Sequence, residues 1–134
     1  PVMAMLSYTN FGSSKHPNAG KVTEAVAYLH RYFPDLVVDG PLQSDFALNR
    51  EMMDKRYPFS QLAKKNVNTL IFPNLESANI TYKLMKELNK NQSVGPILLG
   101  LKEPIHVLQL GASVDEIVNM AAVAVIDAQQ KQKK

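Results

Sequence analysis

The 134-residue chain contains no cysteine and no tryptophan. Without cysteine it has no disulfide framework, no thiol nucleophile and no thiolate metal site. A membrane-spanning helix needs about 20 predominantly apolar residues in a row, and no stretch of the sequence approaches that length. No secretory signal peptide is visible either. We therefore expect a cytoplasmic protein that does not enter a membrane.

The chain also lacks a strong charge imbalance. Its 15 Lys and Arg residues face 12 Asp and Glu residues, and Lys131, Lys133 and Lys134 account for the excess. The remainder of the chain is therefore neutral. Nucleic-acid-binding domains instead concentrate Lys and Arg on one face, commonly with aromatic residues among them. We expect no nucleic-acid partner.

Short motifs for binding nucleotides or metals are absent as well. Neither Gly-x-Gly-x-x-Gly nor Gly-x-x-x-x-Gly-Lys-(Ser/Thr) occurs in the sequence. The three histidines, His16, His30 and His106, lie far apart and have no carboxylate at ligand spacing. We expect no metal and no cofactor bound by this chain itself.

What the sequence does contain is an alternation of short apolar runs with segments whose apolar residues recur at helical spacing. Such alternation predicts an α/β fold with three αβα layers and a largely parallel sheet. The predicted strands are 2–8, 35–40, 68–73, 96–101 and 104–109. The predicted helices are 18–33, 44–55, a helix that begins after Asn74, and 113–129.

Two polar stretches each follow a predicted strand and precede a helix, which is where open α/β sheets usually bind ligands. The stretch 9–17 is rich in hydroxyl and amide side chains. It suits either an anion-binding loop or a simple polar turn. The second stretch contains Gly111 and Ser113. Ser113 and Glu116 match the Ser-x-x-Glu capping box, which predicts the helix start at this point.

Several segments, in the same order along nearly the whole chain, resemble segments of one known family: 2–7, 12–13, 35–43, 71–75, 79–83 and 95–119. They resemble the phosphate acetyltransferase and butyryltransferase family, whose members move an acyl group between coenzyme A and phosphate. The resemblance implies a two-lobed domain with a ligand cleft between the lobes. It also implies that residues 1–134 form the C-terminal portion of such a domain, within a longer chain.

The same resemblance implies a set of acyl-CoA or phosphate-binding residues, which are Ser7, Gly12, Ser13, Asn79, Gly111 and Ser113. Active members of the family have a Ser-Arg pair immediately before the glycine that corresponds to Gly111. This chain has Gln109 and Leu110 there. An arginine holds phosphate through a charged, two-pronged hydrogen bond, whereas leucine has neither charge nor donor.

Glu116 stands where the family has an acid that is assigned as the base. The capping box by itself fully explains this glutamate, and we favour that interpretation. We therefore expect no intact catalytic residues, with Gln109, Leu110 and Glu116 as the degenerate positions.

The substituted Gln109-Leu110 pair is similar to that in copies of this domain fused to the C-terminus of large bacterial NADP-dependent malic enzymes. This implies oxidation of malate to pyruvate, CO2 and NADPH, with NADP and a divalent metal held in the preceding domains. It further implies acetyl-CoA as the effector of a homo-oligomer. An active phosphate acetyltransferase and a module that only assembles the oligomer are the alternatives. The nearly all-round apolar stretch 117–126 also predicts self-association.

Overall fold

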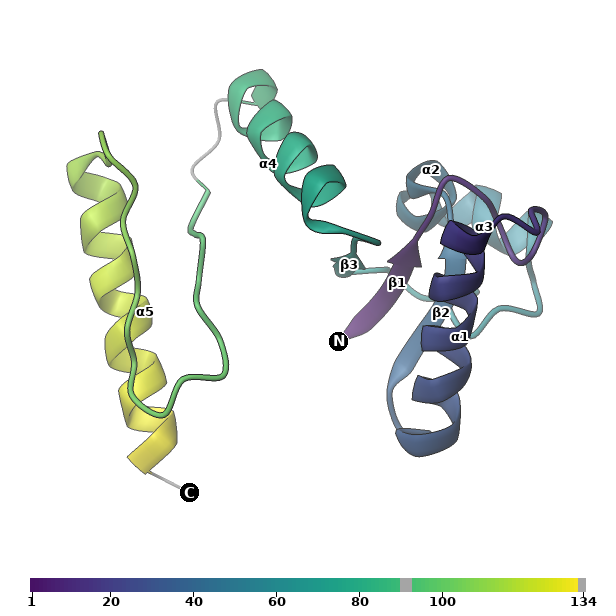
Figure 1. Ribbon diagram of the computed structural model, residues 1–134, viewed down its shortest axis with the longest axis horizontal. Helices are drawn as coiled ribbons and strands as arrows, with labels where there is room; N and C mark the ends of the chain where they lie inside the picture. The colour runs from purple at the N-terminus through teal and green to yellow at the C-terminus, as the bar shows by residue number, and fades with distance from the viewer. Residues whose placement is uncertain (90–92, 133–134) are drawn as a thin grey trace. The chain divides into compact units, whose positions relative to one another are not determined.

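The computed structural model describes residues 1–89 and 93–132. Its elements are β1 (Val2–Leu6), α1 (Pro17–Tyr32), β2 (Val37–Leu42), α2 (Ser44–Leu48), α3 (Arg50–Arg56), β3 (Thr69–Ile71), α4 (Leu75–Asn89) and α5 (Val114–Gln132) (Figure 1). The chain divides into two compact units, unit 1 (residues 1–82) and unit 2 (residues 83–134), with the boundary inside α4. Lys133 and Lys134 of the basic tail lie outside the described residues.

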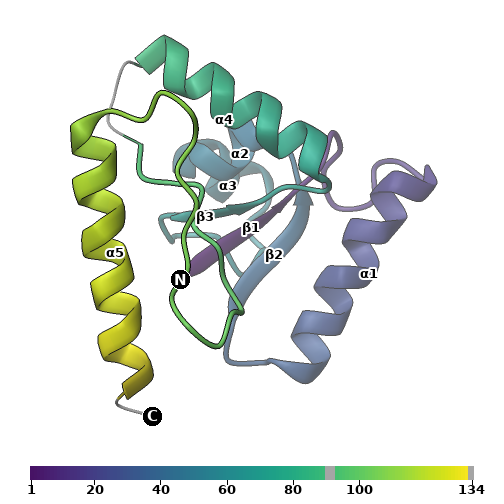
Figure 2. The same ribbon diagram turned by 60° about the vertical axis from the view of Figure 1, so that its left-hand side comes forward.

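Unit 1 is built on a parallel sheet of three strands in the order β2-β1-β3. Val2 pairs with Val37 in β2, and Met3 pairs with Thr69 in β3. Neighbouring parallel strands need a crossover between them, and α1 supplies the one from β1 to β2. It packs against β2, as Figure 2 shows. The α/β fold class and the parallel sheet predicted from the sequence are confirmed.

The pairing of β1 with β2 is interrupted by a bulge. Ala4 pairs with Asp39 and Leu6 with Leu42, so β2 holds one extra residue between these pairs. Gly40 lies in this bulge with φ +150°, and a Cβ added there would stand 2.5 Å from the carbonyl oxygen of Met5. Only glycine tolerates both the backbone angle and this close approach.

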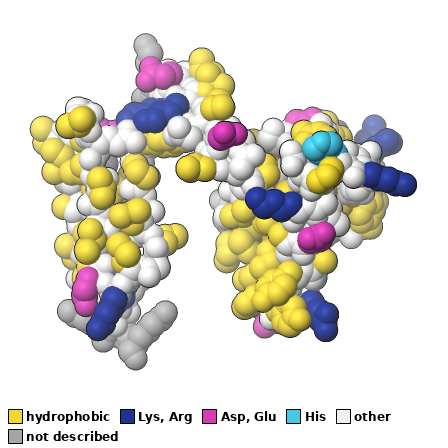
Figure 3. Space-filling view, viewed as in Figure 1, with side chains coloured by type: hydrophobic (Ala, Val, Ile, Leu, Met, Phe, Trp, Pro, Cys, Tyr) yellow, Lys and Arg dark blue, Asp and Glu magenta, His cyan; other side chains and the backbone are white. Residues whose placement is uncertain are grey.

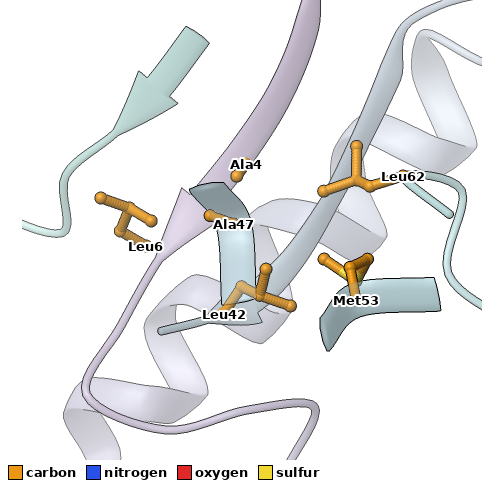
Figure 4. Close-up of a cluster of buried hydrophobic side chains, with 6 residues drawn as sticks. All are labelled: Ala4, Leu6, Leu42, Ala47, Met53 and Leu62. Atoms are coloured by element: carbon orange, nitrogen blue, oxygen red, sulfur yellow. The ribbon is translucent and has the colours of Figure 1, made fainter. Parts of the chain in front are cut away.

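One cluster of core side chains in unit 1 joins the sheet to α2 and α3. Its buried side chains come from β1, β2, the two short helices and the turn after them: Ala4, Leu6, Leu42, Ala47, Met53 and Leu62 (Figure 4). Asp39 is buried beside the core. Its carboxylate accepts from the amides of Gly40 (2.9 Å) and Gln61 (2.9 Å) and from the Ser60 hydroxyl (2.8 Å). These bonds tie β2 to the turn at residues 57–63.

The prediction of a single helix over 44–55 is wrong, because the helix is interrupted at Asn49, which separates α2 from α3. The Asn49 side chain accepts from the amide of Met52 at 3.0 Å and so caps α3. Asparagine is among the preferred helix N-caps because its side chain competes with the backbone for amide donors. The periodic apolar pattern runs on through this position, so periodicity alone did not reveal the break.

The strands predicted over 96–101 and 104–109 are also wrong. Both segments are irregular in unit 2, where Gly95 and Gly100 have φ of +143° and +84°. A strand needs a neighbouring strand for its backbone hydrogen bonds, and none pairs with these segments in the part of the chain that the structure describes. An apolar run indicates burial, but it does not specify a pairing partner.

The last helix of the prediction is confirmed as α5, which ends at Gln132. Met120 of this helix is buried. Large apolar side chains stay exposed around it, namely Val114, Ile117, Val118, Val125 and Ile126. Figure 3 shows hydrophobic side chains spread over unit 2, which contains this helix. The nearly all-round apolar pattern therefore leaves apolar surface on unit 2.

Candidate functional site

The N-terminus of α5 is held by the capping box predicted from the sequence. The Ser113 hydroxyl accepts from the amide of Glu116 at 3.2 Å. In return, Oε2 of Glu116 accepts from the amide of Ser113 at 2.8 Å and from its hydroxyl at 3.1 Å. The box satisfies amides that the first helical turn leaves without partners. One oxygen of the Glu116 carboxylate is thus engaged in local structure.

The other oxygen of this carboxylate is bound by a lysine of α4. Lys86 Nζ donates to Oε1 of Glu116 at 2.7 Å, a charge-assisted hydrogen bond. The Lys86 bond, followed by the bonds from Ser113, lowers the pKa of Glu116 from its ordinary 4.5 to about 2. A group with so low a pKa is ionised at neutral pH but is a weak proton acceptor. A general base works best with a pKa near the operating pH.

A second lysine of α4 reaches the same turn. Lys83 Nζ donates to Oε1 of Gln109 at 2.9 Å. Lys83 and Lys86 are three residues apart in α4 and therefore lie on one face of the helix. The side chains of Gln109 and Glu116, two of the positions predicted to be degenerate, are thus bonded to lysines. Leu110 between them is fully exposed and brings no charge or donor to the turn.

A cavity of about 50 Å³ lies within unit 2 beside this turn. Its walls include Lys86, Ser93, Gly95, Gln109, Gly111 and Glu116. The Ser93 hydroxyl oxygen is buried and has no hydrogen-bond partner among the described residues. A cavity of this size holds a small polar group, whereas pockets for drug-sized ligands measure roughly 300 to 1,000 Å³. The cavity can therefore accept part of a ligand and not a whole coenzyme.

The polar loop of unit 1 is a tight turn with its own hydrogen bonds. Phe11 and Gly12 both have positive φ, at 40° and 79°. The Ser13 hydroxyl bonds to that of Thr9 and accepts from the amide of Asn10. The Ser13 hydroxyl is therefore engaged inside the turn. Gly12 has open space where a Cβ would stand, so this glycine serves the backbone angle.

The loop is anchored to the end of β2 by hydrogen bonds between Asn10 and Gln43. The backbone amide of Gln43 donates to Oδ1 of Asn10 at 2.8 Å, and the Asn10 side chain donates back to Oε1 of Gln43. Gln43 Nε2 also donates to the carbonyl of Tyr8 at 3.0 Å. These bonds place the loop at the carboxyl edge of the sheet, where α/β proteins usually bind ligands.

The predicted binding residues are distributed over both units. Ser7, Gly12, Ser13 and Asn79 belong to unit 1, and Gly111 and Ser113 belong to unit 2. Asn79 is exposed on α4. Sequence reasoning missed the roles of Lys83, Lys86, Ser93, Asn10 and Gln43. Lysines three residues apart on a helix usually indicate a solvated face. The partners of Lys83 and Lys86 lie 26 and 30 residues away in the sequence, so local patterns do not reveal them.

Two further observations bear on the kind of site this chain offers. Among residues 1–89 and 93–132, no group of three or more His, Asp or Glu side chains lies close enough to hold a metal ion. In the same residues, no helix is long and apolar enough to cross a membrane.

Comparison with known proteins shows which proteins this chain is similar to. Residues 1–125 match the phosphate acetyl/butaryl transferase family. The chain is 42% identical over 130 residues to an NADP-dependent malic enzyme of Escherichia coli, covering 96% of this chain and 17% of that protein. It is 41% identical over 130 residues to a phosphate acetyltransferase of Clostridium acetobutylicum, covering 97% of this chain and 39% of that protein.

A solved phosphotransacetylase from Streptococcus pyogenes has the same fold. It superimposes with a TM-score of 0.85 at 38% identity, over 100% of this chain and 40% of that one. The chain therefore spans well under half the length of these relatives. Its motifs, its sheet and its match over residues 1–125 place it in the phosphate acetyl/butaryl transferase family.

Proposed function

We propose that this chain is a catalytically silent member of its family that binds an acyl-CoA, such as acetyl-CoA, as an effector. The observation that carries the proposal is the engagement of Glu116. Both oxygens of the carboxylate are bonded, one to Lys86 and the other to Ser113. The neighbouring Leu110 has no charge for a phosphate group. The turn thus has neither a free base nor an arginine.

Loss of catalysis does not require loss of binding. Binding depends on complementarity to the ligand itself, whereas catalysis needs extra stabilisation of the transition state. Removing a single preorganised transition-state donor typically slows a reaction by about 10² to 10³. The Ser93 hydroxyl and the cavity of about 50 Å³ beside Gly111 still offer polar contacts to a small acyl or phosphate group.

The test combines two measurements on the purified protein. Calorimetry with acetyl-CoA up to millimolar concentration should show binding, and a thiol assay should show no phosphate-dependent release of coenzyme A. Robust release would overturn the proposal in favour of an active phosphate acetyltransferase. Absence of both binding and release would leave a module that only assembles an oligomer.

We also propose that the chain serves an NADP-dependent malic enzyme that converts malate to pyruvate, CO2 and NADPH. The supporting observation is 42% identity to such a protein over 96% of this chain. In this proposal, NADP and a divalent metal are bound by parts of the parent protein outside residues 1–134. An effector that prefers one conformational state changes the affinity of the enzyme for its substrate by linkage, typically by about 5-fold or more.

The experiment for this second proposal compares the full-length protein with a truncation that lacks residues 1–134. Malate oxidation is measured with NADP and a divalent metal while acetyl-CoA is titrated. The full-length protein should respond to acetyl-CoA and the truncated protein should not. An unchanged response after truncation would assign the effector site elsewhere, and absence of malate oxidation would refute the malic-enzyme role.

Self-association is the third part of the proposal. Val118, Val125 and Ile126 of α5 are each more than half exposed, at 60%, 55% and 54%. Monomeric proteins rarely leave large contiguous apolar patches in water. The purified protein should therefore sediment as a homodimer or larger homo-oligomer at micromolar concentration. A stable monomer under these conditions would contradict this part.

A further inference from the structure

The bonds to Glu116 are divided between local and distant parts of the chain. Ser113, three residues earlier, binds only Oε2 of the carboxylate. Lys86, 30 residues earlier and on another helix, binds Oε1 at 2.7 Å. A capping box by itself leaves one carboxylate oxygen open to solvent or to a ligand. In this chain Lys86 occupies that oxygen.

We propose that Lys86 is a positioning residue that fixes Glu116 as an ionised helix cap and thereby keeps this carboxylate from accepting a proton. The inference deepens the proposed function and rests on its premise that the site is catalytically silent. It adds a second cause of that silence. Leu110 in place of the family's arginine removes a cation. Independently, the bond from Lys86 prevents Glu116 from acting as a base.

Charge and exposure favour this role for Lys86. The Lys86 and Glu116 side chains are 36% and 30% exposed, so the pair is partly shielded from water. Further charged groups of these helical turns are Lys83, which binds Gln109, Glu87 beside Lys86 in α4, and Asp115 in the first turn of α5. The described hydrogen bonds to the Glu116 carboxylate come from Lys86 and Ser113. Lys86 is therefore the cation that acts directly on this carboxylate.

The test is a titration of the Glu116 carboxyl group by carbon NMR, performed on the purified protein without any ligand. In Lys86→Met the midpoint should rise from about 2 by roughly one pH unit or more, a tenfold gain in proton affinity. Lys86→Arg keeps a cation with hydrogen-bond donors and should restore a low midpoint. Lys83→Met removes a lysine from the same helix face and should leave the midpoint unchanged.

Three results would overturn the inference, the third being needed where Lys86→Met does not fold. If the midpoint stays at about 2 in Lys86→Met, the bonds from Ser113 are sufficient by themselves. If Lys83→Met raises the midpoint as much as Lys86→Met does, the effect is the general field of α4 and not the pair. If Lys86→Met does not fold, titration of the unmodified protein in 1 M salt decides, because screening should raise the midpoint of a group held by an ion pair. A midpoint that does not respond to salt would then refute the role.

This experiment and that of the proposed function fail separately. Phosphate-dependent release of coenzyme A would refute catalytic silence whatever the midpoint of Glu116. An unchanged midpoint in Lys86→Met would refute the role of Lys86 even in a protein that only binds acetyl-CoA.

Discussion

Asn10 and Gln43 bind each other through reciprocal hydrogen bonds, although they are 33 positions apart in the sequence. The backbone amide of Gln43 donates to Oδ1 of Asn10 at 2.8 Å, and the Asn10 side chain donates back to Oε1 of Gln43. The pair connects the loop after β1 to the residue after β2. It therefore fixes the polar loop at the edge of the sheet where ligands usually bind.

Asn10→Ala should lower the free energy of unfolding by about 1 to 3 kcal/mol, because it leaves partly buried donors and acceptors without partners. Urea denaturation measures the change. Gln61→Ala is the control, since this side chain is exposed and the backbone amide bond to Asp39 remains. Equal stability of Asn10→Ala and the control would show that the amide pair contributes nothing.

Gly40→Ala should destabilise the protein far more than an ordinary glycine substitution. The new Cβ would lie 2.5 Å from the Met5 carbonyl oxygen at a φ of +150°. We expect a loss of about 3 kcal/mol or more, from strain and steric overlap together.

Gly20→Ala provides the matched control for this prediction. It lies in α1, and an added Cβ would meet nothing within 4 Å. Alanine is favoured over glycine inside a helix by roughly 0.5 to 1 kcal/mol, so this variant should be slightly more stable. Similar melting temperatures for Gly40→Ala and Gly20→Ala would contradict the close approach at the bulge.

Glu116 should make stability depend on pH in the acid range. Its folded pKa of about 2 is below the ordinary 4.5, so its stabilising contribution is complete above about pH 4.5. The contribution is lost as pH falls towards 2. Glu116→Gln retains a capping side chain but removes the charge. The difference in unfolding free energy between the two proteins should therefore be constant near neutral pH and shrink between pH 4.5 and 2.

The measurement for Glu116 is a series of urea denaturations from pH 7 to pH 2. Glu24→Gln, on the exposed surface of α1, is the control for loss of one negative charge. A difference between Glu116→Gln and the unmodified protein that does not vary with pH would refute the coupling.

Leu110→Arg should strengthen binding of acyl-CoA if the proposed function is correct. Leu110 is fully exposed beside the cavity, so the substitution disturbs no packing. A guanidinium adds charge-assisted hydrogen bonds to phosphate, and we expect about a tenfold lower dissociation constant. Calorimetry with acetyl-CoA measures it. Leu110→Gln is the uncharged control and should not differ from the unmodified protein. No gain for Leu110→Arg would place the phosphates of the ligand away from this turn.

The amino-acid sequence by itself determined the local features of this protein. Ser113 and Glu116 specified the start of α5, because a capping box needs only side chains three residues apart. Apolar runs specified β1, β2 and β3, because the strands of parallel sheets typically read as continuous apolar runs. The order of the motifs indicated the family, which the match over residues 1–125 confirms, and the pair Gln109-Leu110 led to the prediction that the family's cation is missing.

The tertiary structure decided everything that depends on contacts between distant residues. Lys86 looks like an ordinary surface lysine in the sequence, and only the folded chain brings it to 2.7 Å from Glu116. The reciprocal pair of Asn10 and Gln43 arises in the same way. The segments 96–101 and 104–109 have the composition of strands, yet they are irregular because strand formation requires hydrogen bonds to a neighbouring strand. Periodicity reports which side chains avoid water, whereas pairing and charge contacts are set by which segments meet.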